Sequence, residues 1–260
     1  MTSSRARSRA ALAAAFAAVA AVSAAAAWTL GRQMQANWWC CEVPRSRNWS
    51  LSAQEILHLT HFYSQIGQDK WVLEAAFPGV RNGFFLDVGS ADGLVNSNSK
   101  ALEEHGWSGI CVDPFPTHMQ ARTCRMFKEV VADQAGRQVK FRASGEVGGI
   151  DGTLGRWKDM AASGPLVEFT TVTLADILGR AGAPPVIQYV SIDVEGAELD
   201  VLRGFPFERY TIGILDVEHN YEEPKRAGIA ALMEAHGYHL VRSWLQDDFY
   251  GRKAAGAKDP

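Results

Sequence analysis

Short apolar runs and amphipathic segments alternate along most of the chain, and this alternation predicts strands and helices in turn. The runs GFFLDVG at 83–89, SGICVDP at 108–114 and VIQYVSIDVEG at 186–196 have the length and composition of buried strands. The segment SNSKALEEHG at 97–106 has helical spacing of its apolar residues and ends at a glycine. Apolar strands separated by helices are typical of a parallel sheet. The pattern therefore predicts an α/β fold with a mostly parallel, doubly wound sheet and helices on both faces.

The same patterns predict the other elements of the domain. Further strands are expected at 128–133, 138–144, 211–220 and 238–244, and further helices at 53–65, 117–127, 174–182, 197–205 and 224–237. The glycine-rich stretch from Ser144 to Trp157 is predicted to be a loop, long and flexible enough to act as a lid. Its alternative is an ordered surface excursion without a role. The last residues, 251–260, are predicted to be a disordered tail.

The amino-terminal 32 residues differ in composition from the rest. Arg5, Arg7 and Arg9 precede about twenty uncharged residues, roughly the length that crosses the hydrocarbon core of a bilayer. A basic flank favours an amino terminus in the cytoplasm, so the pattern predicts a single-pass membrane anchor. A cleaved signal peptide and an organelle transit peptide are open alternatives, because the segment is rich in small residues and arginine and has no acidic residue. We expect a targeting segment at 1–32, a stem at 33–51 and a globular domain at 52–250.

Composition and cysteine usage narrow the class of protein. The chain has 26 Lys and Arg against 29 Asp and Glu, a net charge of −3, so no basic excess suggests a nucleic-acid partner. Four cysteines are too few for a disulfide scaffold at this size. Cys111 is expected to be a small buried apolar residue, and Cys124 a helix residue without a special role. No CxxC or HExxH spacing supports a structural zinc site.

Acidic residues recur where the predicted strands end. In a sheet of this kind, ligands bind beyond the carboxyl ends of the strands. Gly89 and Gly93 allow a turn whose backbone approaches a ligand closely, but the turn lacks the GxGxxG spacing that suits a dinucleotide. Neighbouring carboxylates repel a pyrophosphate and attract a cation, such as the sulfonium and ammonium groups of S-adenosylmethionine. The alternative is that these acids cap helices or lie in solvated loop ends. The set consists of Asp87, Asp92, Asp113, Asp193, Glu195, Asp216 and Glu218.

Several segments, in order along the chain, resemble a known family. They are SQIGQDKWV at 64–72, FFLDVGSADG at 84–93, SNSKALEEHGWSGICVDPFP at 97–116, TLADIL at 173–178 and YVSIDVEGAELDVLRG at 189–204. Together they are similar to the FkbM-type methyltransferases, a branch of the Rossmann-like class I enzymes that use S-adenosylmethionine. The similarity extends over residues 60–245.

The resemblance implies a cofactor site made from several of these segments. Asp113 stands where the family usually has a glutamate that holds the ribose, and Asp133 falls where an adenine contact is expected. Gln68 and Asp69 precede the first strand, where polar residues could cap either the amino-acid end of the cofactor or a helix-to-strand corner. The other implied cofactor contacts are Asp87, Gly89, Ser90, Gly93 and Asn98.

Methyl transfer to an oxygen needs a group that aligns the acceptor and removes its proton. We expect Asp193 or Glu195 to be this base, or to hold a magnesium ion through oxygen ligands. Glu218 and His219 are expected to contact the acceptor, a hydroxyl of a glycan or small molecule. The sequence therefore predicts a membrane-tethered O-methyltransferase that uses S-adenosylmethionine. The alternatives are a catalytically silent, membrane-tethered binding or trafficking module and a nicotinamide-dependent enzyme, which the missing GxGxxG spacing disfavours.

Overall fold

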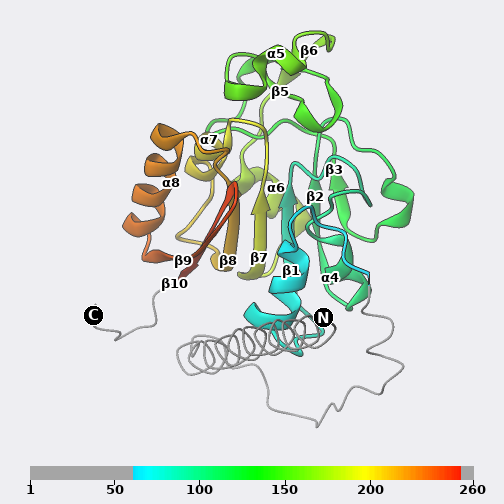
Figure 1. Cartoon of the computed structure of the whole chain (residues 1–260), viewed down its shortest axis with the longest axis vertical. Helices are drawn as coiled ribbons and strands as arrows, with labels where there is room; N and C mark the ends of the chain where they lie inside the picture. Colours follow the sequence, from blue (N-terminus) through cyan, green and yellow to red (C-terminus); the bar gives the residue numbers. More distant parts are fainter. Residues whose placement is uncertain (1–60, 253–260) are drawn as a thin grey trace, which may run out of the picture. The chain divides into compact units, whose positions relative to one another are not determined.

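Figure 1 shows a computed structural model of the chain, which describes residues 61–252. The segments predicted at 1–32 and 33–51, most of the helix predicted at 53–65, and residues 253–260 lie outside the described residues. Residues 61–65, the described end of that predicted helix, are not helical, so this part of the prediction is wrong. Between residues 61 and 252, no helix has the length and apolar character that crossing a bilayer requires.

Seven strands form the central sheet, in the order β3-β2-β1-β7-β8-β10-β9. The first five are parallel to one another, and β10 pairs antiparallel with both β8 and β9. The predicted mostly parallel sheet is therefore confirmed. The strands are β1 (Phe84–Val88), β2 (Ser108–Val112), β3 (Arg125–Phe127), β7 (Val186–Ile192), β8 (Thr211–Glu218), β9 (Tyr238–Trp244) and β10 (Asp247–Arg252).

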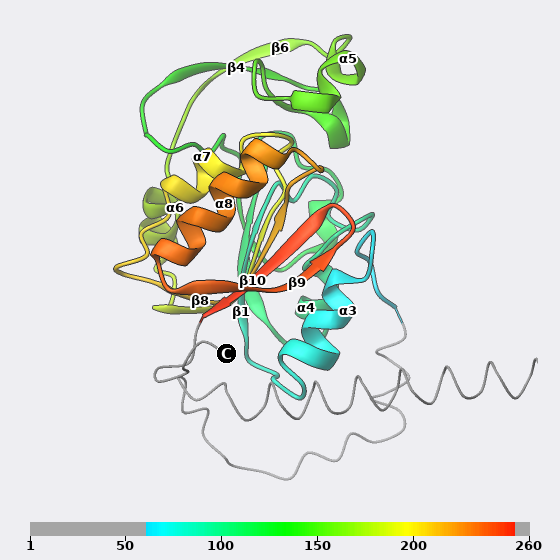
Figure 2. The same cartoon turned by 60° about the vertical axis from the view of Figure 1, so that its left-hand side comes forward.

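Helices cover both faces of this sheet, as the alternating pattern predicts. Figure 2 shows α6, α7 and α8 on one face and α3 and α4 on the other. Leu86, Val190 and Leu215, from three neighbouring strands, are fully buried in the core on which the sheet and helices pack. The helices are α3 (Gln68–Trp71), which continues as a π-helical turn at Val72–Ala76, α4 (Lys100–Glu104), α6 (Leu174–Ala181), α7 (Glu198–Arg203) and α8 (Glu223–Ala235).

A smaller antiparallel sheet lies beyond the carboxyl ends of the parallel strands (Figure 1). It has the order β5-β4-β6, and the helix α5 (Lys158–Ala161) lies beside it. A Cβ atom on Gly196 would lie 1.9 Å from the carbonyl oxygen of Thr153, so this layer packs directly on the turn after β7. The stretch predicted as a loop contributes β5 to it. Its strands are β4 (Gln138–Arg142), β5 (Gly149–Ile150) and β6 (Leu166–Thr170), and short 3-10 helices occupy Gly145–Val147 and Gly155–Trp157.

The segment between β2 and β4 differs from the prediction. The helix predicted at 117–127 is wrong, because these residues form a 3-10 helix at Met119–Ala121 and then the strand β3. Pairing of β3 with the edge of β2 overrides the local helical pattern. The strand predicted at 128–133 is also wrong, since the segment contributes one isolated bridge, from Val131 to Val172.

The cysteines and the last strand also differ from expectation. Cys111 and Cys124 form a disulfide with 5.8 Å between their Cα atoms, so the prediction that Cys124 is a helix residue without a special role is wrong. Cys111 is fully buried, as predicted. The sequence predicts no strand after the one at 238–244, but in the structure β10 follows this strand and inserts between β8 and β9. Gly251 and Arg252, two residues of the predicted tail, belong to β10.

Candidate active site

Two adjoining cavities open at the carboxyl ends of the parallel strands. The larger cavity, of about 300 Å³, lies against the ends of β1 and β2 and against β4 and β5 of the smaller sheet. The smaller cavity, of about 220 Å³, lies between the turn after β1, the ends of β7 and β8 and the start of β10. No lysine or arginine is among the described residues that line them. Both are lined by Gly89, Ala91, Asp92, Glu146, Asp193 and Glu195.

Asp113 supplies the carboxylate at the end of β2 in the larger cavity. Its Oδ1 accepts a hydrogen bond from the backbone N–H of Phe115 at 2.7 Å, and its Oδ2 accepts one from Ala91 at 3.0 Å. Burial raises the pKa of Asp113, and these two hydrogen bonds oppose the rise. Because each carboxylate oxygen has a second lone pair, Asp113 can accept further hydrogen bonds from a hydroxyl-bearing ligand. Val131 and Phe141 give the cavity apolar walls.

Gly89 brings the ends of β1 and β7 into direct contact. Its φ is 87°, in the region that side chains rarely adopt. A Cβ atom at this position would lie 1.6 Å from the carbonyl oxygen of Asp193. The backbone N–H of Asp193 in turn donates to the carbonyl of Val88 at 2.9 Å. A glycine is therefore required here, because only a residue without a side chain lets the turn after β1 lie against Asp193 at the end of β7.

Asp193, Glu195 and Glu218 are three of the carboxyl groups that line the smaller cavity. Burial raises the pKa of Asp193 to about 7 and that of Glu195 to about 9, and repulsion from neighbouring carboxylates adds to both shifts. Burial and the same neighbours raise the pKa of Glu218 to about 11. The amide of Asn220 donates to Glu218 and, at 3.4 Å, to Glu195. The rise in pKa is smallest for Asp193, so the ionised form is disfavoured least at Asp193 among these three carboxyls. A carboxylate that titrates near neutrality is suited to act as a general base.

The turn after β7 holds Asp193 and Glu195 in place. Glu195 has a φ of 55°, which is uncommon for a residue with a side chain and is typical of positions held by their surroundings. Glu198 supplies that support from the first turn of α7. Its Oε1 accepts from the backbone N–H of Gly196 at 2.8 Å, and its Oε2 pairs with the ammonium of Lys225 at 2.7 Å. Glu198 therefore has a structural role in this turn.

One group of carboxylates in this region has the spacing of metal ligands. Oxygen atoms of Asp193, Glu198 and Glu218 lie within 4.8 Å of one another. The contacts of Glu198 with backbone N–H groups and with Lys225 already use both of its oxygens. The pair predicted to hold magnesium is a different one, Asp193 and Glu195, and that metal site stays a prediction.

Two residues that line the smaller cavity have buried polar atoms without a partner in the described part of the chain. Ser90 is 5% exposed, and neither its Oγ nor the Oδ1 of Asn98 has a hydrogen-bond partner among the described residues. Both residues line the cavity, together with Gln68. The amide of Gln68 donates to Asp247 at 2.7 Å. Buried polar groups are normally hydrogen-bonded. Because both of these atoms are buried, a ligand in the cavity would reach them only after a local movement of the surrounding side chains.

Asp87 reaches the smaller cavity from the side of β1 that faces α4. It is 4% exposed, and it accepts a hydrogen bond from the hydroxyl of Ser99. Burial raises the pKa of Asp87, whereas the nearby charge of Arg122 and the hydrogen bond from Ser99 lower it. Of the predicted site residues, the structure places nine along the two cavities: Gln68, Asp87, Gly89, Ser90, Asn98, Asp113, Asp193, Glu195 and Glu218.

Two predicted cofactor contacts have other partners. The carboxylate of Asp69 accepts from the backbone N–H groups of Tyr63 and Lys70, each at 2.7 Å, and so caps the corner before β1. Asp133 forms an ion pair with Arg137 at 3.0 Å. Neither aspartate lines a cavity. For Asp69, the structural alternative given by the sequence fits the observed contacts.

Gly93 and His219 also lie outside the cavity walls. Gly93 supports the turn, since its N–H donates to the carbonyl of Thr117 at 2.9 Å. His219 is 1% exposed, and its Nδ1 accepts from the backbone N–H of Tyr221 at 3.0 Å. Burial lowers the pKa of His219, which favours the neutral ring.

Asp247 is a cavity residue that the sequence analysis missed. It begins β10, is 4% exposed and lines the smaller cavity beside Gln246. Burial raises its pKa to about 6. The acidic pair before Phe249 and Tyr250 was the available signal. Nothing local in the sequence places this strand beside β8, however, so the strand-end argument could not find it.

Comparison with known proteins agrees with this arrangement. The chain matches the Methyltransferase FkbM domain over residues 87–240, which is more than half of its length. No curated protein and no solved structure matched it in the same comparisons. The matched segment carries most of the residues that line the two cavities. A methyltransferase domain of this kind implies S-adenosylmethionine as the methyl donor and an acceptor substrate. The chain belongs to the FkbM methyltransferase family.

Proposed function

We propose that the protein is an O-methyltransferase that binds S-adenosylmethionine across the two cavities and methylates a hydroxyl of a glycan or small molecule. The observation that carries this proposal is the composition of the cavity walls: acidic side chains line both cavities, and no basic side chain is among their described lining residues. The cofactor supplies a methyl group on a positively charged sulfur. An acidic lining attracts such a cation and repels phosphate-bearing cofactors.

Asp113 and the apolar wall of the larger cavity fit the nucleoside part of the cofactor. Asp113 has lone pairs left to accept from the ribose hydroxyls, and Val131 and Phe141 can pack against the adenine. Ser90 and Asn98, whose buried polar atoms lack partners within residues 61–252, line the smaller cavity, where the amino-acid part would bind.

Asp193 is the residue that we assign as the general base. It lies at the junction of the two cavities, and its pKa of about 7 leaves it ionised in a large share of molecules at neutral pH. The acceptor oxygen would lose its proton to Asp193 as its bond to the methyl carbon forms, and the carbon–sulfur bond would break. The raised pKa values of Glu195 and Glu218 favour their protonated forms, which can donate hydrogen bonds to the acceptor. In the alternative with magnesium, Asp193 and Glu195 would both be ionised and would hold the metal through their oxygens. Loss of activity after addition of a chelator would support this alternative.

The mouth of the smaller cavity narrows the class of acceptor. Val95 is 59% exposed and Met160 is 63% exposed, and both line the cavity together with Trp157. Apolar rim residues above an acidic floor favour an acceptor that carries an apolar portion and no anionic group.

Calorimetric titration of the purified full chain with S-adenosylmethionine tests the proposal. We expect one binding site per chain. The Asp113→Asn variant should have an affinity roughly tenfold to a hundredfold lower, since hydrogen bonds to a charged group contribute about 1.5 to 3 kcal/mol. The control is Glu208→Gln, an exposed residue before β8 at the opposite end of the sheet. An unaltered protein that gives no binding heat, or an Asp113→Asn variant that binds as tightly as the control, would refute the proposal.

We also propose that residues 1–32 tether the domain to a membrane, as their composition predicts. Alkaline carbonate washing should leave the full chain in the membrane pellet and release a variant without residues 1–32. Release of the full chain would contradict the tether.

A further inference from the structure

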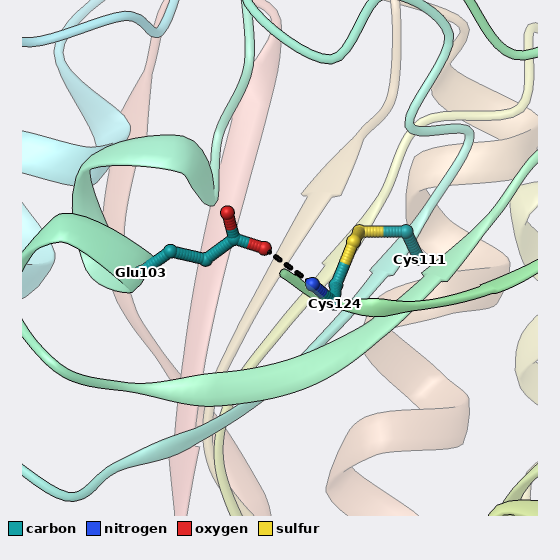
Figure 3. A group of neighbouring side chains, drawn as sticks. All are labelled: Glu103, Cys111 and Cys124. Carbon is teal, nitrogen blue, oxygen red and sulfur yellow. Dashed lines mark hydrogen bonds between the residues drawn. A yellow bond between two sulfur atoms is a disulfide. The ribbon is translucent and has the colours of Figure 1, made fainter. Parts of the chain in front are cut away.

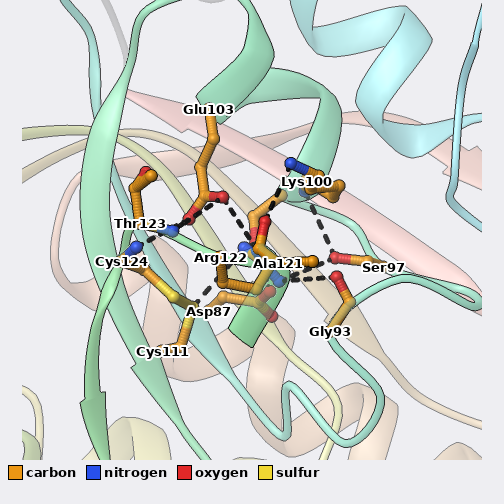
Figure 4. Close-up of a disulfide and its surroundings, with 11 residues drawn as sticks. Asp87, Gly93, Ser97, Lys100, Glu103, Cys111, Ala121, Arg122, Thr123 and Cys124 are labelled. Carbon is orange, nitrogen blue, oxygen red and sulfur yellow. Dashed lines mark hydrogen bonds and ion pairs between the residues drawn. A yellow bond between two sulfur atoms is a disulfide. The ribbon is translucent and has the colours of Figure 1, made fainter. Parts of the chain in front are cut away.

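A buried arginine lies behind the turn that follows β1 (Figure 4). The side chain of Arg122 is 1% exposed. Its Nη1 donates to the carbonyl of Gly93 at 3.3 Å and to the hydroxyl of Ser97 at 3.1 Å, and its Nη2 donates to the hydroxyl of Ser99 at 2.7 Å. Gly93 closes the turn, while Ser97 and Ser99 precede α4. One guanidinium group therefore joins the turn to the start of the following helix.

Through Ser99, Arg122 also acts on the wall of the smaller cavity. The hydroxyl that accepts from Arg122 donates to Asp87, which lines this cavity. The charge of Arg122 opposes the rise in the pKa of Asp87 that burial causes. Arg122 itself lines neither cavity, so its influence on a ligand passes through the residues that it holds.

The segment that carries Arg122 pairs with the turn through its backbone as well. The N–H of Thr117 donates to the carbonyl of Ala91, and the N–H of Gly93 donates to the carbonyl of Thr117, each at 2.9 Å. A Cβ atom on Gly93 would lie 2.9 Å from the carbonyl oxygen of His118, so the two segments are in close contact. The position of residues 117–124 thus helps to set the position of the turn.

A disulfide fixes the end of this segment to the sheet. Cys124, two residues after Arg122, is bonded to Cys111 in the middle of β2, and Cys111 lies opposite Asp87 in the register of β1 and β2. Arg122 Nη2 also lies 3.5 Å from the sulfur of Cys111. Figure 3 shows the disulfide beside Glu103, whose carboxylate accepts from the backbone N–H of Cys124 at 2.8 Å. These three residues have the spacing of metal ligands, but the two sulfur atoms are bonded to each other.

We propose that Arg122 is a positioning residue for the cofactor site and that the Cys111–Cys124 disulfide holds it in place, so that cofactor affinity depends on the oxidation state of these cysteines. The inference rests on the proposed function, because it assumes that the cofactor binds at this turn. A dithiol reductant would give two electrons and two protons to the disulfide, producing two thiols and becoming a disulfide itself. Residues 117–121, which are mostly exposed, would then keep only their noncovalent contacts with the turn.

The first experiment titrates the full chain with S-adenosylmethionine before and after dithiothreitol treatment, with intact mass confirming that the disulfide is reduced. We expect the dissociation constant to rise at least tenfold on reduction. The Cys124→Ser variant, which has no such disulfide, should bind as weakly as the reduced protein and should not respond to dithiothreitol. This variant also controls for the other cysteines, Cys40 and Cys41.

The second experiment tests Arg122 in the oxidised chain. Arg122→Gln should weaken binding at least tenfold, and Arg122→Lys should recover part of the affinity, because lysine keeps the charge but not the planar set of donors. The control is Arg203→Gln, whose side chain is 55% exposed on α7. All titrations are made well below the melting temperature of each variant, so that a loss of affinity is separated from unfolding.

The two proposals fail in different ways. Oxidised, unaltered protein that does not bind S-adenosylmethionine would contradict the proposed function. Oxidised and reduced protein that bind equally well, or an Arg122→Gln variant with unchanged affinity, would overturn this inference alone.

Discussion

Replacement of Gly89 by alanine should disable the turn on which both cavities depend. The new Cβ atom would lie 1.6 Å from the carbonyl oxygen of Asp193, whereas real Cβ atoms keep at least 3.0 Å, so the two strand ends must separate by about 1.4 Å. The positive φ of 87° adds strain, about 1 to 2 kcal/mol for a residue with a side chain. Because displacements of about 1 Å can reduce function by roughly a hundredfold, we expect a similar loss of affinity for S-adenosylmethionine, or about 2.7 kcal/mol.

Gly136→Ala is the matched control for this experiment. Gly136 has a similar φ of 83°, but nothing lies within 4 Å of the position that its Cβ atom would take. Both variants therefore carry the strain of a left-handed alanine, and only Gly89→Ala carries the collision. Calorimetric titration should give a dissociation constant for Gly136→Ala within about threefold of the unaltered protein. Equal affinities of the two variants would refute the argument that close approach of β1 and β7 builds the site.

Three further predictions follow from the carboxyl cluster and from a helix cap. The base must be ionised, and burial raises the pKa of Asp193 to about 7, so the rate of methyl transfer should fall as the pH drops below about 7. The Asp193→Asn variant should lower this rate by about a hundredfold or more. A variant with the full rate and an unchanged pH profile would contradict the assignment of Asp193 as the base. The pKa of Glu218 in the folded protein, about 11, is above its value in the unfolded chain. The contribution of Glu218 to stability is therefore present at low pH and is lost as the pH rises. Replacing Glu218 by glutamine should raise the melting temperature more at pH 9 than at pH 5, and an equal change at both pH values would contradict this prediction. Thr173→Ala removes the capping box of α6 and should lower the melting temperature by about 2 to 4 °C, for a loss of about 1 kcal/mol, without changing cofactor affinity.

Much of the site could be predicted because it uses the carboxyl ends of neighbouring parallel strands. Asp113 and Asp193 each follow an apolar run, and a parallel sheet brings such ends to one edge. The positions of the strand ends could be predicted from the sequence, but the direction of each side chain at those ends could not. Glu218 is the last residue of β8, and His219 follows the end of the strand, where the alternation of side chains no longer gives the direction. Glu218 lines the smaller cavity, and His219 instead lies 3.6 Å from Asp248.

The features that escaped prediction depend on pairing between segments distant in the sequence. Asp247 reaches the smaller cavity because β10 inserts between β8 and β9, an antiparallel arrangement that no local pattern encodes. The Cys111–Cys124 disulfide requires β3 to lie beside β2, and β3 falls in a segment with helical periodicity. Arg122 has no motif of its own, and its importance becomes visible only from its buried contacts.

The central claim is that negative side chains at these strand ends attract a positively charged methyl donor. The most direct test compares the dissociation constants of S-adenosylmethionine and of its neutral product, S-adenosylhomocysteine, in the unaltered protein and in Asp193→Asn at pH 8, where Asp193 is mostly ionised. Loss of the charge on residue 193 should weaken binding of the methyl donor more than binding of the product. The ratio of the two dissociation constants should therefore change by about fivefold, or about 1 kcal/mol. A ratio that is the same in both proteins would contradict the claim.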